Sequence, residues 1–171
     1  SVQPFFGLFA ASAHPLRVRI RHGLVNVGIG VVNGLAIRFG FLTIWLYAMR
    51  WADTHGVGVL NWFSVPQWLR WVIALLLMDL WTYTWHRLSH IVPWIWRFHR
   101  LHHSDRQMDV TTANRFHLGE ITLSAIARVP VLVAIGCNLE ELALYELLLF
   151  AVLQFHHATI GLTPWLDRAL R

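Results

Sequence analysis

The sequence predicts an all-α fold, a polytopic membrane helical bundle of about four spanning segments with a cytosolic, histidine-rich cap. Three observations predict this fold class. Hydrophobic residues make up 56% of the 171 residues and charged residues only 13%, whereas soluble domains carry about 25% charged residues. The apolar residues fall into long runs, and a polar stretch between two of these runs holds six of the eleven histidines. A chain of this length is expected to form one domain.

The first predicted span covers residues 23–47, an apolar run that is long enough for the ~20 residues that cross a bilayer. Three arginines precede it, Arg17, Arg19 and Arg21. Because the cytoplasmic flanks of membrane helices are rich in basic residues, this cluster places the N-terminus in the cytosol. Arg38 lies in mid-span, so we expect it either to face the bundle interior or to mark a break in the segment.

Three further apolar runs, residues 68–85, 118–137 and 142–155, predict the remaining spans. Each pair of crossings returns the chain to the same side of the membrane. The polar stretch 86–117 and the histidine pair 156–157 are therefore both expected on the cytosolic face. The net charge of +5 comes from arginines that flank the apolar runs, and ten tryptophans suit membrane interfaces. This pattern favours a membrane, and not nucleic acid, as the partner of the basic residues.

The histidines are grouped at helical spacing. His86 and His90 are four residues apart, so they share one face of a helix. The second group is His99, His102 and His103, the third is His156 and His157, and His117 lies alone between them. Neutral imidazole binds iron, copper, nickel and zinc, and so many histidines exceed the needs of one ion. The pattern predicts a centre with two metal ions.

Two kinds of zinc site fit this histidine pattern less well. A zinc protease would carry a glutamate between the two histidines of a helical pair, and none lies between His86 and His90. A closed structural zinc site usually uses thiolates, whereas the chain has one cysteine, Cys137.

Asp79 and Tyr83 precede the first histidine group on the same predicted helix. Asp79 lies seven residues before His86, two helical turns along the same face. We expect its carboxylate to accept a hydrogen bond from an imidazole N–H, which would fix the tautomer of that ligand, with Tyr83 in the same network. The alternative is a structural ion pair of Asp79 with Arg38 or Arg70.

Other polar residues have simpler interpretations. Isolated histidines are mostly satisfied core or interface residues, and this expectation applies to His14, His22 and His55. An ion pair at the start of the third span accounts for Arg115 and Glu120. The acidic residues around the last turn are expected in solvent: Glu140, Glu141 and Glu146.

Four segments follow one another along the chain: LLLMDLWTYTWHRLSH, VPWIWRFHRLHHSD, DVTTANRFHLGE and LQFHHATIGLTPWLDRALR. In order and spacing they resemble the fatty acid hydroxylase/sterol desaturase superfamily of membrane di-iron enzymes. The resemblance implies a helical membrane fold with a cytosolic metal cap, two iron ions, and O2 as co-substrate. It also implies an electron-donor redox protein as partner. The substrate would be lipid-like, drawn from the bilayer, and would be hydroxylated, desaturated or cleaved at an ether bond.

The resemblance also assigns positions within the site. The histidines that match ligand positions are His86, His90, His99, His102, His103 and His157, with His117 and His156 as further candidates. Leu118 stands where the family usually has a proline after Arg-x-His. The family's last His-x-x-His-His box is lacking, because no histidine follows Thr163-Pro164. We therefore expect residues 1–171 to be a fragment of one membrane-embedded fatty acid hydroxylase-like domain without its C-terminal part.

An alternative interpretation is a membrane haem-binding electron-transfer protein that uses paired histidines on facing helices. One haem takes only two axial ligands, which leaves the crowded second histidine group unexplained. Sterol, fatty acyl, sphingoid, carotenoid and ether-lipid substrates all fit the same histidine pattern. Every basic residue is arginine, a bias typical of GC-rich bacterial genomes, so a bacterial inner membrane is favoured over the endoplasmic reticulum.

Overall fold

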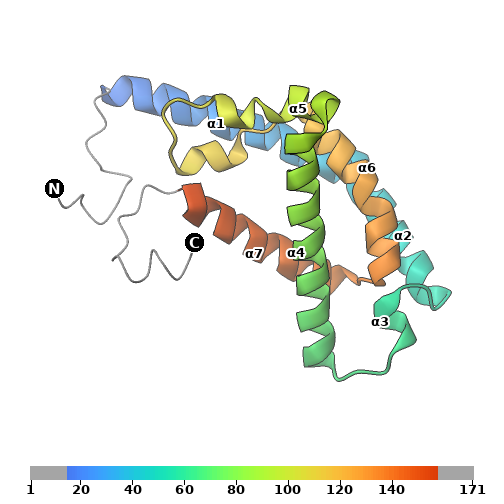
Figure 1. The fold of residues 1–171 in the computed structure, drawn as a ribbon. Coiled ribbons are helices and arrows are strands. Elements are labelled where there is room, and N and C mark those ends of the chain that lie inside the picture. Colours follow the sequence, from blue (N-terminus) through green and yellow to red (C-terminus); the bar gives the residue numbers. More distant parts are fainter. Residues whose placement is uncertain (1–14, 158–171) are drawn as a thin grey trace.

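The computed structural model describes residues 15–157, and every regular element in this range is helical (Figure 1). The long helices are α1 (Leu16–Ala36), α2 (Leu42–Thr54), α4 (Gln67–Ile91), α6 (Leu118–Ile135) and α7 (Leu139–His157). The shorter elements are the π-helix η1 (Ile37–Phe41), α3 (Val59–Trp62), α5 (Pro93–His99) and the 3-10 helices η2 (His102–Ser104) and η3 (Val110–Asn114). The predicted all-α class is confirmed.

Two helical stretches of the described chain are long and apolar enough to cross a membrane, Leu16–Trp62 and Leu118–Ile135. They correspond to the first and third predicted spans. Helices α4 and α7 occupy the places of the second and fourth predicted spans, but they do not qualify by the same measure. The two stretches suggest a membrane protein. The four crossings and the cytosolic side of the histidines remain predictions.

The regular α-helical geometry of the first predicted span is interrupted at Arg38. The π-helix η1 replaces the regular α-helical hydrogen bonding between α1 and α2, and such π-turns are local insertions in otherwise regular helices. Arg38 is exposed, and its guanidinium carbon lies 5.9 Å from the centre of the Phe39 ring. Arg38 therefore lies at a local irregularity in a continuous helical stretch, and the alternative of an interior Arg38 is wrong.

Helices α2, α4, α6 and α7 share one apolar core. Its buried side chains include Trp45, Met49, Met78, Leu132, Leu142 and Tyr145. The indole N–H of Trp45 donates to the carbonyl of Ala125 at 3.0 Å, which ties α2 to α6. This core fixes α4, α6 and α7 relative to one another, and these three helices carry most residues of the candidate site.

Arg70, in the first turn of α4, holds the turn between α6 and α7. It donates to Oε1 of Glu141 at 2.7 Å and to the carbonyls of Leu60 and Gly136 at 2.6 and 2.7 Å. The Glu141 side chain is 0% exposed, so the expectation of a solvated glutamate there is wrong. Because Arg70 is engaged by Glu141, it does not form the ion pair with Asp79 that the sequence left open.

Two glycines allow the chain before α3 to touch the end of α6. Gly136 ends α6 with a left-handed φ of 72°, and Gly58 has a φ of 107°. A Cβ on Gly58 would lie 2.4 Å from the Cα of Gly136. Both the backbone conformation and the close approach therefore require glycine.

The polar stretch after α5 lies between α1 and α7. Figure 1 shows α1 across the top of the view, and η3 contacts both α1 and α7. Gly30 permits the approach to α1, since a Cβ there would lie 2.9 Å from Cβ of Asn114. The side-chain amide of Asn33 donates to the carbonyl of Phe116 at 2.9 Å. Helix α1 thus packs at the histidine-bearing end of the molecule.

Candidate metal centre

His86, His90, His99 and His103 form a quartet where α4 meets α5. One ring nitrogen of each lies within 4.8 Å of the others. Nε2 of His86 is 3.2 Å from Nε2 of His90, and Nε2 of His99 is 3.2 Å from Nε2 of His103. In the structure, the first histidine group, His86 and His90, therefore lies next to His99 and His103 of the second group.

Val92 and Pro93 turn the chain so that the two groups face each other. Val92 is extended, with φ −92° and ψ 112°, and it ends α4. Pro93 opens α5, a position that suits proline because its missing N–H would have no helical partner there. The reversal leaves the ring centroids of His90 and His99 4.8 Å apart.

His102 and His157 form a pair beside the quartet. Their Nε2 atoms are 3.3 Å apart, and Nδ1 of His157 donates to the carbonyl of Leu153 at 2.8 Å. The buried His102 ring stacks on Phe116, with centroids 4.5 Å apart and planes at 8°. It lies 5.7 Å from the ring centroid of His99, so the pair adjoins the quartet. The last turn of α7 therefore reaches the cluster.

Glu120 contacts the quartet from the first turn of α6. Its Oε1 is 2.7 Å from Nδ1 of His99, and both side chains are buried. Arg115 donates elsewhere, to Oδ1 of Asn26 at 3.1 Å and to the carbonyl of Leu101 at 3.3 Å. The predicted ion pair of Arg115 with Glu120 is therefore wrong, and Glu120 is a site residue that the sequence interpretation missed.

Four of the cluster histidines are held in their uncharged form: His86, His90, His102 and His103. Burial, followed by repulsion among the neighbouring imidazoles, lowers the pKa of His86 to about 4. The same two causes lower the pKa of His102 to about 3. Burial and the nearby His99 also lower the pKa values of His90 and His103. Because metal ions bind deprotonated imidazole, these four histidines present free nitrogen ligands at neutral pH.

Comparison with known proteins identifies the family. A family model described as Fatty acid hydroxylase matches residues 71–171, which is more than half of the chain and includes every histidine of the cluster. The chain belongs to the fatty acid hydroxylase family. The resemblance predicted from the four sequence segments is thus confirmed.

One curated relative of this fatty acid hydroxylase chain is an ornithine lipid hydroxylase of Rhizobium tropici. It is 37% identical over 75 residues, which cover 38% of this chain and 23% of the relative. The chain therefore matches only about a quarter of that relative's length. No solved structure was found to match the chain.

The side chains of the cluster fit the metal centre that is expected in a member of the fatty acid hydroxylase family. All six clustered side chains are imidazoles, the ligand type that suits iron and other first-row metals. Two further buried atoms at the cluster, Nδ1 of His102 and Oε2 of Glu120, have no hydrogen-bond partner. Buried polar atoms are rarely left unpaired. The donor set and these unpaired atoms are compatible with a bound cation.

The structure does not bring His117 and His156 into the cluster. Nδ1 of His117 accepts a hydrogen bond from the Gly119 N–H at 2.9 Å, so this histidine caps α6. Its ring lies 5.0 Å from the ring of Phe98. His156 is exposed beside Phe155 on α7. Both remain candidates from the sequence alone.

Asp79 and Tyr83 are exposed on α4 and lie apart from the hydrogen bonds of the cluster. The Tyr83 hydroxyl accepts a long contact of 3.5 Å from Arg87. Within residues 15–157, no hydrogen bond joins Asp79 to His86. Their expected role in orienting an imidazole stays a prediction.

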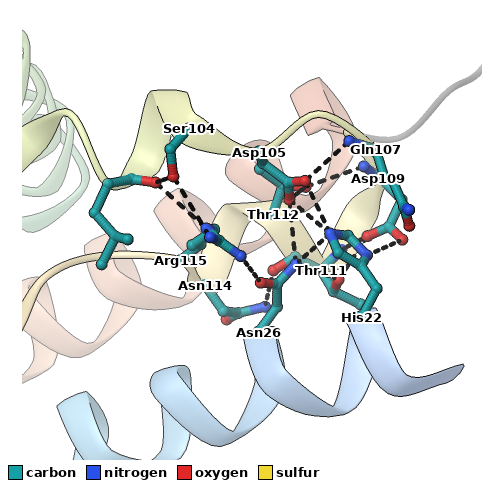
Figure 2. Close-up of polar contacts among 11 residues, drawn as sticks. His22, Asn26, Ser104, Asp105, Gln107, Asp109, Thr111, Thr112, Asn114 and Arg115 are labelled. Carbon is teal, nitrogen blue, oxygen red and sulfur yellow. Dashed lines mark hydrogen bonds and ion pairs between the residues drawn. The ribbon is translucent and has the colours of Figure 1, made fainter. Parts of the chain in front are cut away.

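A separate polar network joins the chain after His103 to α1 (Figure 2). Nε2 of His22 is 2.9 Å from the carboxylate of Asp105, and Nδ1 is 3.2 Å from Oδ2 of Asp109. Asn26, one turn further along α1, accepts a hydrogen bond from Arg115 at 3.1 Å. His22 is thus a satisfied interface residue, as expected for an isolated histidine.

Asp105 is the centre of this network. Burial alone would raise its pKa, but hydrogen bonds from the Gln107 N–H, the Thr112 hydroxyl and His22 lower it to about 2. The N–H of Gln107 lies 3.0 Å from Oδ1, and the Thr112 hydroxyl lies 2.7 Å from Oδ2. The carboxylate is therefore ionised at neutral pH and fixes the chain two residues after His103.

The remaining polar residues have local or structural partners. Nδ1 of His55 donates to the carbonyl of Trp51 at 2.9 Å, and the two rings stack. Arg128 forms an ion pair with Glu146, which is partly exposed. The third isolated histidine, His14, lies outside the described residues.

Proposed function

We propose that this chain forms the metal centre of a membrane lipid hydroxylase, which oxidises a lipid C–H bond with O2 at a histidine-ligated di-iron site. One observation carries the proposal. In a member of the fatty acid hydroxylase family, histidines from α4, the α5 turn and α7 converge on one site. Four of them lie within 4.8 Å of one another, and the other two are 3.3 Å apart.

The quartet and the pair suggest how two ions would be divided. His86, His90, His99 and His103 would hold one ion, and His102 and His157 would contribute to the second. When bound, iron would supply the redox chemistry that lets O2 oxidise an unactivated C–H bond. In hydroxylation one oxygen atom enters the product and the other leaves as water, so two electrons and two protons are consumed. We propose an electron-donor redox protein as their source.

Two aromatic side chains would keep the imidazoles of this site ordered. Phe116 stacks on His102, and Trp96 packs against the rings of His90 and His103 at centroid distances of 5.4 and 5.7 Å. Such rings limit the rotamers of the imidazoles they touch.

The substrate is proposed to be a polar lipid that enters from the bilayer. The family and the name of the Rhizobium tropici relative both favour lipid hydroxylation, with desaturation as the other outcome of the same chemistry. We further propose that α4 and α7 cross the membrane together with the two apolar stretches. The histidine cluster would then face the cytosol of a bacterial inner membrane.

The haem alternative is less well supported. A haem takes two axial ligands per site, whereas four imidazoles share one site here. A Soret absorption band in the purified protein would favour haem, and we expect none.

Metal content and product analysis test the proposed function. We expect the full-length protein, purified in detergent and reconstituted with Fe²⁺, to retain iron. With O2, a chemical reductant and bacterial membrane lipids, we expect a lipid product heavier by one oxygen atom, detected by mass spectrometry. Stoichiometric zinc in place of iron, or no iron at all, would overturn the di-iron proposal.

A further inference from the structure

Glu120 places a buried carboxylate next to the quartet, and the proposed function assigns this side chain no role. We propose that Glu120 is a positioning residue that sets the tautomer and basicity of His99, so that Nε2 of His99 is the atom offered to a metal ion. The inference deepens the proposed function, because it rests on the quartet being a metal site. A binding experiment can show that Glu120 lacks this role even if the quartet binds a metal ion.

The hydrogen bond decides where the His99 proton lies. A neutral imidazole donates through the one ring nitrogen that carries its hydrogen, and Nδ1 of His99 is 2.7 Å from Oε1 of Glu120. This contact favours the tautomer with the hydrogen on Nδ1, in which Nε2 keeps its lone pair. Nε2 is also the atom that lies 3.2 Å from Nε2 of His103 within the quartet. A carboxylate on the far nitrogen of a ligand imidazole raises its basicity and fixes its orientation.

The fold places Glu120 for this contact. His117 caps α6, and Glu120 sits in the first turn, where the positive end of the helix dipole stabilises a carboxylate. Gly119 lets α5 approach, because a Cβ there would lie 2.9 Å from the ring of Phe98. Phe98 directly precedes His99, so this close packing carries His99 onto the carboxylate.

Glu120 has no arginine partner within the described part of the chain. Arg115, the nearest arginine in the sequence, donates to Asn26 and Leu101 instead. Oε2 of Glu120 is buried without a hydrogen-bond partner. A buried polar atom that is left unpaired is costly. A cation held by the neighbouring imidazoles would reduce this cost.

Cobalt binding to the whole chain tests the role of Glu120 without any activity. The apo protein in detergent is titrated with Co²⁺, and the visible absorption of the bound ion reports both affinity and ligand field. We expect Glu120→Ala to weaken Co²⁺ binding by about 10- to 100-fold, the usual effect of losing such an orienting group. Glu120→Gln keeps the size of the side chain but not its charge, and we expect a loss of about tenfold with a shifted spectrum.

Two further variants distinguish positioning from general damage. Glu141→Gln removes a different buried carboxylate, the partner of Arg70, and should lower the thermal midpoint without changing Co²⁺ affinity. His99→Ala should weaken binding, and adding Glu120→Gln to it should cause no further loss. A further loss in the double variant, or wild-type affinity in both Glu120 variants, would overturn the inference alone. Failure of the wild-type chain to bind Co²⁺ or Fe²⁺ would overturn the metal site as well.

Discussion

At the scale of single residues, His102 links the two parts of the cluster. Its ring lies 5.7 Å from that of His99 in the quartet, and its Nε2 faces His157 at 3.3 Å. Phe116 holds it from the other side. A side chain with three such neighbours has little freedom to move, so its loss cannot be compensated by a shift of the remaining imidazoles.

In the full-length protein, we therefore expect His102→Ala to abolish lipid hydroxylation and to lower the iron content after purification. The reason is the loss of a ligand atom together with the contact that joins α7 to the quartet. Iron is measured by elemental analysis and product by mass spectrometry. His55→Ala is the matched control, because His55 contacts only its own helix and the turn after it. Normal turnover by the His102 variant would contradict its assignment as a ligand.

The sequence predicted some of these residues better than others, for physical reasons. Spacing of three or four residues on a helix is a local property, so the grouping of His86 with His90 follows from periodicity. Adjacent helical residues point about 100° apart, which explains why His157 reaches the cluster and His156 does not. The contact of His99 with Glu120 crosses 21 residues. Only the packing of α5 on α6 creates it, and no spacing rule predicts it.

At the scale of elements, α1 acts as a support for the polar stretch. Its buried polar residues, Asn26 and Asn33, lie on the side that faces η3 and Phe116. They are seven residues apart, two helical turns, so they lie on one side of the apolar part of α1.

Removing one partner from this interface should destabilise the protein. We expect His22→Ala to lower the free energy of unfolding by about 1–3 kcal/mol, because a nearly buried carboxylate, that of Asp105, loses a hydrogen bond. Thermal unfolding in detergent measures the effect. We expect His55→Ala, which breaks only local contacts near the surface, to leave the midpoint within error of the wild type. Equal midpoints for both variants would contradict the proposed support by α1.

At the scale of the whole molecule, the open question is how the helices cross the membrane. The stretch Leu16–Trp62 and helix α6 are apolar enough to do so, whereas α4 and α7 are not by the same measure. Yet α4 and α7 share the apolar core with α2 and α6. Exposed leucines continue along both helices, among them Leu76 and Leu80 on α4 and Leu147 and Leu148 on α7. Large exposed apolar side chains suit a lipid environment, which favours four crossings.

Labelling of single introduced cysteines distinguishes a chain that crosses the membrane four times from one that crosses it twice. With a cytosolic N-terminus, four crossings place Arg106 in the cytosol and Glu140 on the opposite side of the membrane. If only the two apolar stretches cross, Glu140 is in the cytosol and Arg106 is on the opposite side. In a Cys137→Ser background, Arg106→Cys and Glu140→Cys are labelled in cells with a membrane-impermeant maleimide. Both wild-type side chains are exposed. Ser64→Cys is the positive control, because Ser64 is exposed and follows the stretch Leu16–Trp62, the first crossing in either arrangement.

We expect the cysteine at position 140 to be labelled in intact cells and the cysteine at position 106 only after permeabilisation. Four crossings are expected because α4 and α7 must bury their exposed apolar faces, and lipid on both sides of the core achieves this. The same result would put the histidine cluster on the cytosolic side, within reach of a cytosolic electron donor. The reverse labelling pattern would contradict both the four crossings and the side of the histidines, and it would leave the geometry of the cluster unaffected.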